Sequence, residues 1–369
     1  MFPTALPRTL QAIENGIARG WHIGAQIFVA LHGQEIANLG IGQSRPGVEM
    51  TPHTVMLLLS ACKPIGAVAI AQLIERGTLA LDTRVADVIP EFGKLGKEPI
   101  TVRHILTHTC GFRFGETGWP AADWEEIISR VCDIRLERNW EIGMTAGYHP
   151  NTSWFIVGEI VRRLDGRPYE QYVRDEILVP LGMEDCWIGM PADRYRGYGS
   201  RMEILQQMDK GPPRTLSPWD REESFTHCRP AANGCGPAAQ LGRFYQMLLN
   251  GGELDGARIL QADTARQFTS RQRVGLFDLS FKHIVDFGFG FIVSSNRYGA
   301  DTVPYGFGPH ASDETFGHNG FQSTSAFADP RHGLVAVIIP NGTPGDVVHE
   351  QRLREMLGAL YEDLGLAGQ

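Results

Sequence analysis

The spacing of apolar residues changes along the chain and predicts its elements in order. Leu10, Ile13 and Ile17 recur at helical intervals, so an amphipathic helix is expected within the first twenty residues. Residues 24–42 are typical of two strands joined at a His32–Gly33 turn, which predicts an antiparallel hairpin. The chain is therefore expected to begin with a helix and a hairpin.

A long helical middle is predicted after the hairpin. The pattern is helical from Ser60 to about Arg76, with Gly77 in the position of a C-cap. Glycine-terminated helices are also expected at 100–111, 152–166, 168–182 and 238–252. The stretch from about Arg194 to Pro237 is rich in proline, glycine and charge, and it predicts long loops.

Strand patterns return in the last quarter of the chain. Residues 287–295, 323–330 and 333–342 are typical of strands, and 347–365 predicts a closing helix. If these strands pair with the first hairpin, the two ends of the chain build one layer.

The fold class that follows is α+β, with an antiparallel sheet flanked by N- and C-terminal helices and an inserted, mostly helical lobe. We place the discontinuous α/β lobe at residues 1–72 and 236–369, and the helical lobe at 73–235. A cleft between two lobes is the usual place for a site. Ser60 falls where the chain first crosses between the lobes.

Composition narrows the classes of function. The chain has 369 residues, 43% of them hydrophobic, and a net charge of -8. No dense basic run is present, so we expect no nucleic-acid partner. No apolar stretch is long enough to span a membrane, and the first twenty residues lack the pattern of a signal peptide, so a cytoplasmic protein is expected. The oligomeric state stays open.

The motif Ser60-Ala61-Cys62-Lys63 has two interpretations. In the first, Ser60 caps a helix and Lys63 is a solvated lysine one turn later. In the second, Ser60 is a nucleophile and Lys63 its base, because residues three apart lie on one helix face and a desolvated lysine has a lowered pKa. The motif alone leaves both open.

The surrounding sequence resembles the class C β-lactamase-like serine hydrolases. The stretches that carry the likeness are SACKPIGAVAIAQLIERGTLALDTRVADVIPEF, ITVRHILTHTCGF, YHPNTSWFIVGEIVRRLDGRPYEQYVRDEILVPLGM, GRFYQMLLNGGELDGARIL and FGHNGFQSTSAFADPRHGLVAVIIPNG. They follow the order of that superfamily from about residue 20 to 345. The resemblance implies a β-lactamase/transpeptidase-like fold and Ser60 as nucleophile. The superfamily includes β-lactamases, D-alanyl carboxypeptidases, family VIII carboxylesterases and natural-product acyltransferases.

The resemblance also implies a proton-shuttling tyrosine. Tyr148 stands at the matching place, and it would need the nearby ammonium of Lys63 to act as a base near neutral pH. Many relatives have Tyr-Ser-Asn where this chain has Tyr148-His149-Pro150. His149 is therefore expected either to contact substrate in place of the missing asparagine or only to orient Tyr148.

A third motif departs from class C β-lactamases, which have Lys-Thr-Gly on the strand beside the cleft. This chain has His318-Asn319-Gly320, and the resemblance implies that His318 points into the cleft. Gly320 would let the strand approach the substrate closely. The backbone N–H groups of Phe321 and Ser60 would then form an oxyanion hole. The alternative for His318 is an ordinary turn histidine before a strand.

No cofactor and no metal are expected. His104 and His108 have the i, i+4 spacing of metal ligands, but no glutamate stands between them as in H-E-x-x-H and no third ligand follows. The six cysteines lack CxxC spacing and are expected to be free thiols, with Cys62 facing the core.

The function expected first is a carboxylesterase acting on a small-molecule ester. An acyltransferase or tailoring enzyme that uses the same acyl-enzyme is the nearest alternative. A D-aminopeptidase, DD-peptidase or β-lactamase is a further alternative. The lack of a signal-peptide pattern disfavours a cell-wall peptidase or a periplasmic β-lactamase, because those enzymes act outside the cytoplasm. The last alternative is a non-catalytic binding protein, against which the combination of Ser60, Lys63 and Tyr148 counts.

Overall fold

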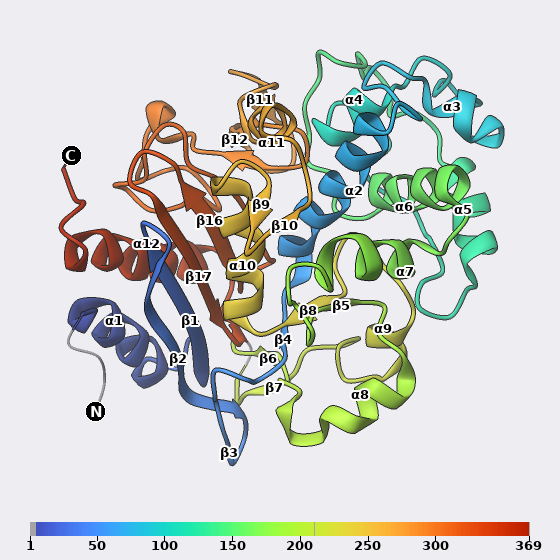
Figure 1. Ribbon diagram of the computed structural model, residues 1–369. Coiled ribbons are helices and arrows are strands. Elements are labelled where there is room, and N and C mark those ends of the chain that lie inside the picture. Colours follow the sequence, from blue (N-terminus) through green and yellow to red (C-terminus); the bar gives the residue numbers. More distant parts are fainter. Residues whose placement is uncertain (1–4, 210, 369) are drawn as a thin grey trace.

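Both ends of the chain contribute to one eight-stranded sheet. The computed structural model describes residues 5–209 and 211–368, and the strand order in this sheet is β13-β14-β15-β16-β17-β1-β2-β3 (Figure 1). Its strands are β1 (Gly24–Leu31), β2 (Gln34–Arg45), β3 (Val48–Glu49), β13 (Asp286–Phe287), β14 (Ile292–Val293), β15 (Phe316–Asn319), β16 (Ser325–Asp329) and β17 (Leu334–Pro340). The predicted hairpin is confirmed, with His32 and Gly33 at positive φ in its turn.

The pairing of β1 with β17 joins the two halves of the sheet. The strands are antiparallel over seven residue pairs, from Ala25 opposite Pro340 to Leu31 opposite Leu334. Because side chains alternate across a strand, the sheet has two apolar faces. Ile27 and Val29 pack with the two terminal helices, whereas Phe28 and Ala30 belong to the larger core on the other side. The predicted antiparallel α+β architecture is therefore confirmed.

Helices cover both faces of this sheet. The terminal helices lie together on one face and α10 lies on the other (Figure 1). The α-helices are α1 (Pro7–Ala18), α2 (Lys63–Glu75), α3 (Val85–Val88), α4 (Val102–Leu106), α5 (Trp124–Cys132), α6 (Thr152–Asp165), α7 (Tyr169–Val173), α8 (Ala192–Tyr198), α9 (Glu223–Thr226), α10 (Ala238–Leu249), α11 (Ala262–Thr269) and α12 (Asp346–Asp363). Helices α6 and α12 confirm the expectations for 152–166 and 347–365, and Gly166 closes α6 in the left-handed conformation.

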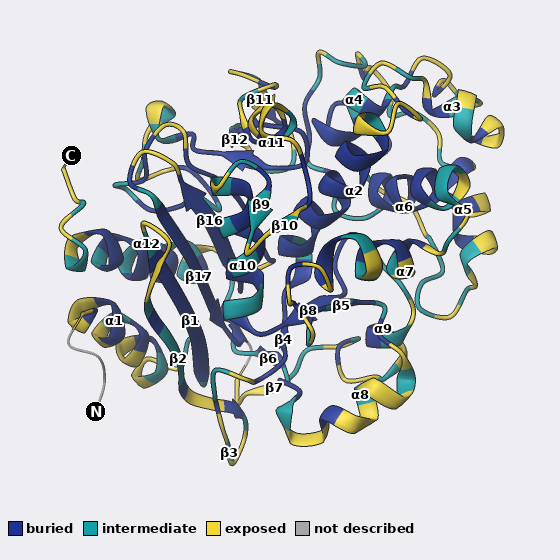
Figure 2. Ribbon diagram, viewed as in Figure 1, coloured by how far each residue is buried: buried dark blue, intermediate teal, exposed yellow. Residues whose placement is uncertain are grey.

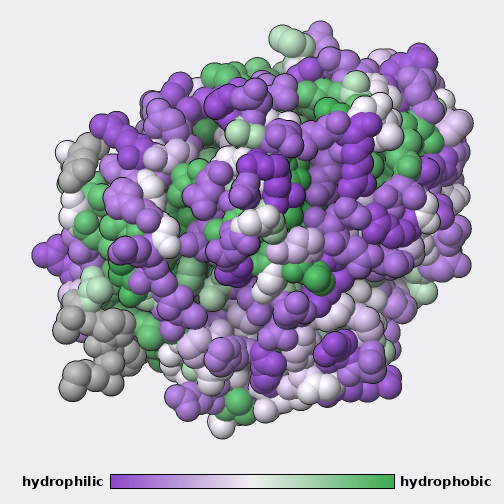
Figure 3. Space-filling view, in the orientation of Figure 1, coloured by the Kyte–Doolittle hydropathy of each residue, from purple (hydrophilic) through white to green (hydrophobic). Residues whose placement is uncertain are grey.

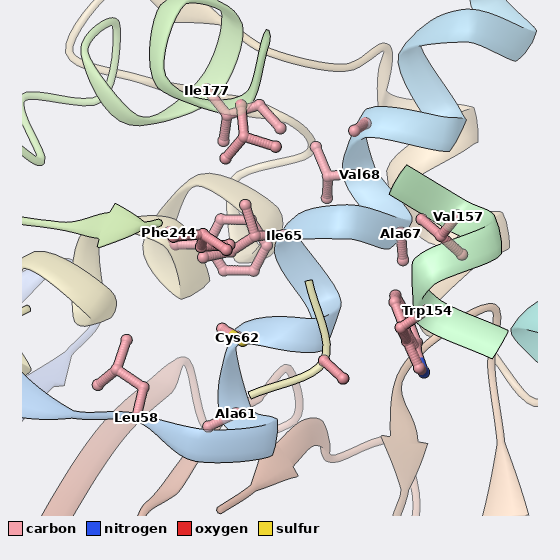
Figure 4. Close-up of a cluster of buried hydrophobic side chains, with 14 of the residues drawn as sticks. Leu58, Ala61, Cys62, Ile65, Ala67, Val68, Trp154, Val157, Ile177 and Phe244 are labelled. Carbon is pink, nitrogen blue, oxygen red and sulfur yellow. The ribbon is translucent and has the colours of Figure 1, made fainter. Parts of the chain in front are cut away.

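Helix α2 runs through the middle of the molecule. Every residue from Lys63 to Leu73 is buried, and the ribbon of α2 is dark over this length in Figure 2. Ala67 faces Trp154 and Val157 of α6, while Ile65 lies near Phe244 of α10 (Figure 4). The start of α2 is thus fixed from several directions, which matters because it follows Ser60.

Short elements connect these parts. The short strands are β4 (Met56–Leu57), β5 (Trp187–Ile188), β6 (Gln206–Gln207), β7 (Arg214–Thr215), β8 (Gly234–Gly236), β9 (Glu253–Leu254), β10 (Ala257–Arg258), β11 (Phe277–Asp278), β12 (His283–Ile284) and β18 (Gly342–Thr343). The 3₁₀ and π turns are η1 (Leu59–Cys62), η2 (Pro90–Phe92), η3 (Arg174–Leu178), η4 (Gly199–Arg201) and η5 (Asn296–Tyr298). Hydrophilic residues dominate the face seen in Figure 3, and no helix in the described ranges is long and apolar enough to cross a membrane.

One sequence-based expectation is refined by the structure, and three need correction. Residues 60–62 form a 3₁₀ turn, and the α-helix begins only at Lys63. The helix expected at 100–111 ends at Leu106, because His108 already has a positive φ of 57°. The strand expected at 287–295 is broken at Gly288–Gly290 into β13 and β14. Residues 194–237, expected as loops, contain α8, α9 and short strands.

Candidate active site

A cavity of about 250 Å³ opens beside Ser60, between the end of β15 and the loop before α6. Its lining is mostly aromatic and aliphatic, with a few neutral polar groups and one acid. The lining residues are Ser60, Tyr148, Pro150, Ser280, Phe281, Ile292, Tyr305, His318, Asn319, Phe321 and Asp346. Five of the eight predicted site residues reach this cavity. A concave, largely apolar site with a few polar groups suits a small molecule.

Ser60 lies in a sharp turn between a strand and a helix. The chain leaves β4, turns through η1, and enters α2 at Lys63. Leu59, which precedes the serine, has a φ of 53°, a left-handed conformation that a leucine rarely adopts. Its side chain is nevertheless buried. Such backbone strain persists only where the surroundings enforce it, and it is common at functional sites.

Lys63 is buried, with three oxygen atoms around its amine. Nζ lies 3.0 Å from Ser60 Oγ, 3.0 Å from the Pro150 carbonyl and 2.8 Å from the Ala231 carbonyl. No carboxylate pairs with it within the described chain. Burial lowers the pKa of Lys63 to about 7, and the nearby Arg229 acts in the same direction. A neutral amine can donate its two hydrogens to the carbonyls and present its lone pair to the serine hydroxyl.

Tyr148 holds its ring beside this amine. Lys63 Nζ lies 5.1 Å from the centroid of the ring, and the Tyr148 backbone N–H donates a 3.0 Å hydrogen bond to Asp278. The hydroxyl oxygen is buried and has no hydrogen-bond partner within the described chain. Burial raises the pKa of Tyr148 above its usual value, although Ser60 opposes this shift. The direction of this shift favours the protonated phenol near neutral pH.

The end of β15 brings His318, Asn319 and Gly320 next to the serine turn. His318 is buried, its Nδ1 contacts its own neighbour's carbonyl, and its Nε2 is unpartnered within the described chain. Burial, reinforced by Lys63, lowers the pKa of His318 to about 3, so the ring is neutral. Asn319 donates to the Tyr305 carbonyl at 2.5 Å. The ring of His318 is thus a neutral polar group at the cavity wall.

Gly320 lets two backbones approach closely. A Cβ atom at this position would lie 2.5 Å from the Leu58 carbonyl oxygen, which is far inside van der Waals contact. This close approach is to the turn that holds Ser60. Phe321 follows, with 52% of its side chain exposed at the cavity mouth. Its backbone N–H has no acceptor within the described ranges.

His149 lies away from the cavity, which corrects its expected contact with substrate. Its side chain is buried, and Nε2 accepts hydrogen bonds from the backbone N–H groups of Gly111 and Phe112. Its own backbone N–H donates to His108 Nδ1 at 3.0 Å. His149 thus ties the segment that carries Tyr148 to the loop after α4. Burial lowers the pKa of His149 to about 3, so the ring remains a neutral acceptor.

Several cavity residues were not predicted from the sequence. Ser280, Phe281 and Tyr305 lie on loops between β11 and β15, and Asp346 is the first residue of α12. None of them stands in a periodic or motif context. No sequence signal marks them as site residues. Tertiary folding alone brings them to Ser60.

Metal ligands do not gather in the described part of the chain: no group of three or more His, Cys, Asp and Glu side chains could hold an ion. His104 instead caps its own helix through Thr101, and His108 is buried beneath Tyr148. The six cysteines are free, and burial raises the pKa of Cys62 to about 11. A thiol with so high a pKa is a poor nucleophile at neutral pH.

The chain is similar to known proteins over most of its length. The model of the Beta-lactamase family matches residues 10–361. Penicillin-binding protein 4 of Amycolatopsis lactamdurans is 28% identical over 353 residues, or 91% of this chain and 85% of the relative. Esterase EstB of Burkholderia gladioli is 32% identical over 182 residues, or 44% of this chain and 46% of the esterase. A penicillin-binding protein homologue from Caulobacter crescentus has a TM-score of 0.81 at 29% identity, with 98% of both chains covered.

Proposed function

Because this chain belongs to the Beta-lactamase family, a family of serine hydrolases, we propose that it is a carboxylesterase that forms an acyl-enzyme on Ser60. The observation that supports this proposal most is the distance of 3.0 Å between Lys63 Nζ and Ser60 Oγ. Ser60 lines the cavity, and Lys63 lies behind it. A nucleophile and a base within hydrogen-bond reach are the signature of covalent catalysis. The esterase among the relatives supports the choice of ester over amide.

In acylation, Ser60 Oγ attacks the ester carbonyl while neutral Lys63 takes the hydroxyl proton. The pKa of about 7 makes such a neutral amine available near physiological pH. Collapse of the tetrahedral intermediate breaks the bond to the alcohol. The alkoxide takes the phenolic proton of Tyr148, and the Lys63 ammonium replaces that proton. This sequence gives Tyr148 the role of a proton relay, in keeping with its raised pKa.

The developing oxyanion would be held by two backbone N–H groups. One is that of Ser60, which stands at the start of a helical turn where amides have no acceptor within the turn. The other is that of Phe321 at the end of β15. Donors that are fixed before reaction stabilise the transition state strongly, because they need no reorganisation. Gly320 supports this pairing by allowing β15 to approach Leu58.

In deacylation, water attacks the acyl carbonyl while neutral Lys63 accepts its proton. Collapse of the second tetrahedral intermediate then breaks the bond between the acyl group and Ser60 Oγ, and the Lys63 ammonium returns the proton to Oγ. An acceptor alcohol in place of water would make the protein an acyltransferase, and this remains the second candidate. Incubation of the acyl-enzyme with candidate alcohols separates the two, because transfer yields a new ester that hydrolysis does not. A peptidase or β-lactamase is less favoured, because the cavity offers no cation for a substrate carboxylate.

The test of the proposal is covalent labelling of Ser60. A fluorophosphonate should add once to the wild-type protein, and peptide mass spectrometry should locate the adduct on Ser60. The Ser60→Ala variant should neither be labelled nor hydrolyse p-nitrophenyl butyrate. Hydrolysis at the wild-type rate by Ser60→Ala would contradict the mechanism. Absence of both labelling and turnover in the wild type would favour the non-catalytic binding protein.

A further inference from the structure

The cavity beside Ser60 carries negative charge but no positive charge. Among its lining residues, Asp346 is the single acid, and none is a lysine or an arginine. His318 reaches the cavity, but with a pKa lowered to about 3 by burial and by Lys63 its ring is uncharged. A substrate anion would therefore enter this cavity without a cationic partner.

Three cationic side chains lie behind the cavity wall, and each of them already has protein partners. Arg113 donates to Ser280 Oγ at 3.0 Å, but its remaining donors bind Glu137. Arg273 is buried against Asp278 at 2.9 Å. Lys63 lies behind Ser60, with its amine held between backbone carbonyls. None of these three cations lines the cavity.

Two more cations lie near the mouth. Arg352 is buried and donates to the backbone carbonyls of Gln322 and Gly342. Lys282 follows Phe281 in the chain and is exposed, but it is not a lining residue. Within the described chain, Lys282 is the exposed lysine or arginine that directly adjoins a lining residue in the sequence. It therefore serves as the matched control for Asp346.

Asp346 is held at the rim of the cavity through one of its two carboxylate oxygens. Its Oδ1 accepts hydrogen bonds from Gln322 Nε2 at 2.8 Å and from the Tyr305 hydroxyl at 3.3 Å. Its Oδ2 has no partner within the described chain, and no ion pair involves this residue there. Gln322 in turn accepts from the Gly345 N–H at 2.8 Å, which secures the start of α12. The carboxylate is therefore held in place with one oxygen open to a ligand.

We propose that Asp346 is a specificity-determining residue, through which the cavity favours cationic esters, tolerates neutral ones and disfavours anionic ones. The inference rests on the proposed esterase function. An exposed charge pair changes affinity modestly, by about two- to fivefold, because water and salt screen it. The effect is a preference among substrates and leaves the chemistry at Ser60 unchanged.

Esters of equal shape and different charge test this preference. For the acyl side we would use p-nitrophenyl 4-(trimethylammonio)butanoate, its neutral isostere p-nitrophenyl 5,5-dimethylhexanoate, and p-nitrophenyl 4-sulfobutanoate. For the alcohol side we would use butyrate esters of choline, 3,3-dimethylbutanol and 2-hydroxyethanesulfonate. In at least one series, kcat/KM should fall from cation to anion by at least about fourfold. Added salt should reduce the ratio.

Variants then assign the preference to Asp346. Asp346→Asn keeps an oxygen acceptor for Gln322, and it should lower the cation-to-anion ratio of kcat/KM at least threefold. Lys282→Gln should leave that ratio within twofold of wild type. Equal ratios in Asp346→Asn and wild type, or an anionic ester as good as the cationic one in both series, would overturn the proposal.

Equilibrium binding separates this inference from the proposed function. Non-reactive anilides of the same three acyl groups can be titrated calorimetrically into Ser60→Ala, with and without Asp346→Asn. The inference is supported if Ser60→Ala binds the cationic anilide more tightly than the other two and if Asp346→Asn removes this difference. This result does not depend on whether any ester is hydrolysed. Equal binding of all three anilides, together with equal ester ratios, overturns it even if Ser60 is labelled and esters are hydrolysed.

Discussion

The amine of Lys63 lies 3.0 Å from the hydroxyl of Ser60, at the junction of the η1 turn with α2. The same amine has two backbone carbonyls around it and no carboxylate within the described residues. This arrangement needs no third side chain to orient the base, because the carbonyls do so. It also provides the sharpest tests of the proposed chemistry.

Replacing Lys63 by methionine should remove the base and leave the fold intact. Methionine fills a similar volume in the buried site, and loss of a general base costs about 10²–10⁴-fold in rate. Acylation by p-nitrophenyl butyrate, followed by stopped flow, should fall by that factor while circular dichroism stays unchanged. Lys94→Met, which removes a lysine paired with Asp133, is the control. Wild-type acylation in Lys63→Met would exclude the role.

The pH dependence of kcat/KM should follow Lys63. Its pKa is lowered to about 7, and only the neutral amine can accept the serine proton. The rate constant should therefore rise tenfold per pH unit below about pH 7 and level off above it. Measurement from pH 5 to 9 with an ester that does not titrate checks this. A flat profile across that range would contradict a lysine base, since Tyr148 remains protonated throughout it.

Gly320→Ala should damage both stability and turnover. The new Cβ would lie 2.5 Å from the Leu58 carbonyl, so β15 and the serine turn must separate. Overpacking of this kind costs about 1–3 kcal/mol, and it would shift the Phe321 N–H away from the oxyanion position. Urea unfolding and kcat would report the two effects. Gly197→Ala in α8, where a Cβ meets nothing within 4 Å, should leave kcat unchanged.

Asp278→Ala should destabilise the protein by about 3–5 kcal/mol, because it leaves the buried Arg273 without its counter-ion. Asp278 also accepts from the backbone N–H groups of Tyr148 and Ser280, so the Tyr148 loop should loosen as well. Chemical unfolding measures the loss. A double change with Arg273→Met should recover part of the stability. No recovery would show that the backbone contacts of Asp278 matter more than the ion pair.

Local sequence patterns predicted most elements of the fold. The hairpin at His32–Gly33 and the helix closed by Gly166 follow from turn and capping chemistry, and both are present. The predicted helical start at Ser60 is present, but as a 3₁₀ turn that passes into the α-helix at Lys63. The short-range pattern could not reveal this turn or the positive φ of Leu59 before it. Likewise, Gly288–Gly290 interrupts a pattern that otherwise predicts one continuous strand.

The site was predicted only where a motif could be matched. Ser60, Lys63, Tyr148 and His318 were singled out. Ser60, Tyr148 and His318 line one cavity, and Lys63 contacts Ser60 from behind its wall. His149 was matched by position, but its ring bonds a neighbouring loop, because burial and backbone donors decided its orientation. Asp346 lies almost 290 residues from Ser60 on the first turn of the last helix, and no local pattern indicates its place at the rim.

The left-handed conformation of Leu59 has a practical consequence. Holding a leucine there costs about 1–3 kcal/mol, and burying its side chain returns a similar amount. The two contributions nearly cancel, so the turn keeps this shape only while the packing around it is intact, and conditions that weaken apolar burial should act on it. Dilute urea or a water-miscible solvent should relax the turn while the eight-stranded sheet remains intact. A preparation can then give an unaltered spectrum and no turnover, so the quality of a sample must be judged by titrating reactive Ser60.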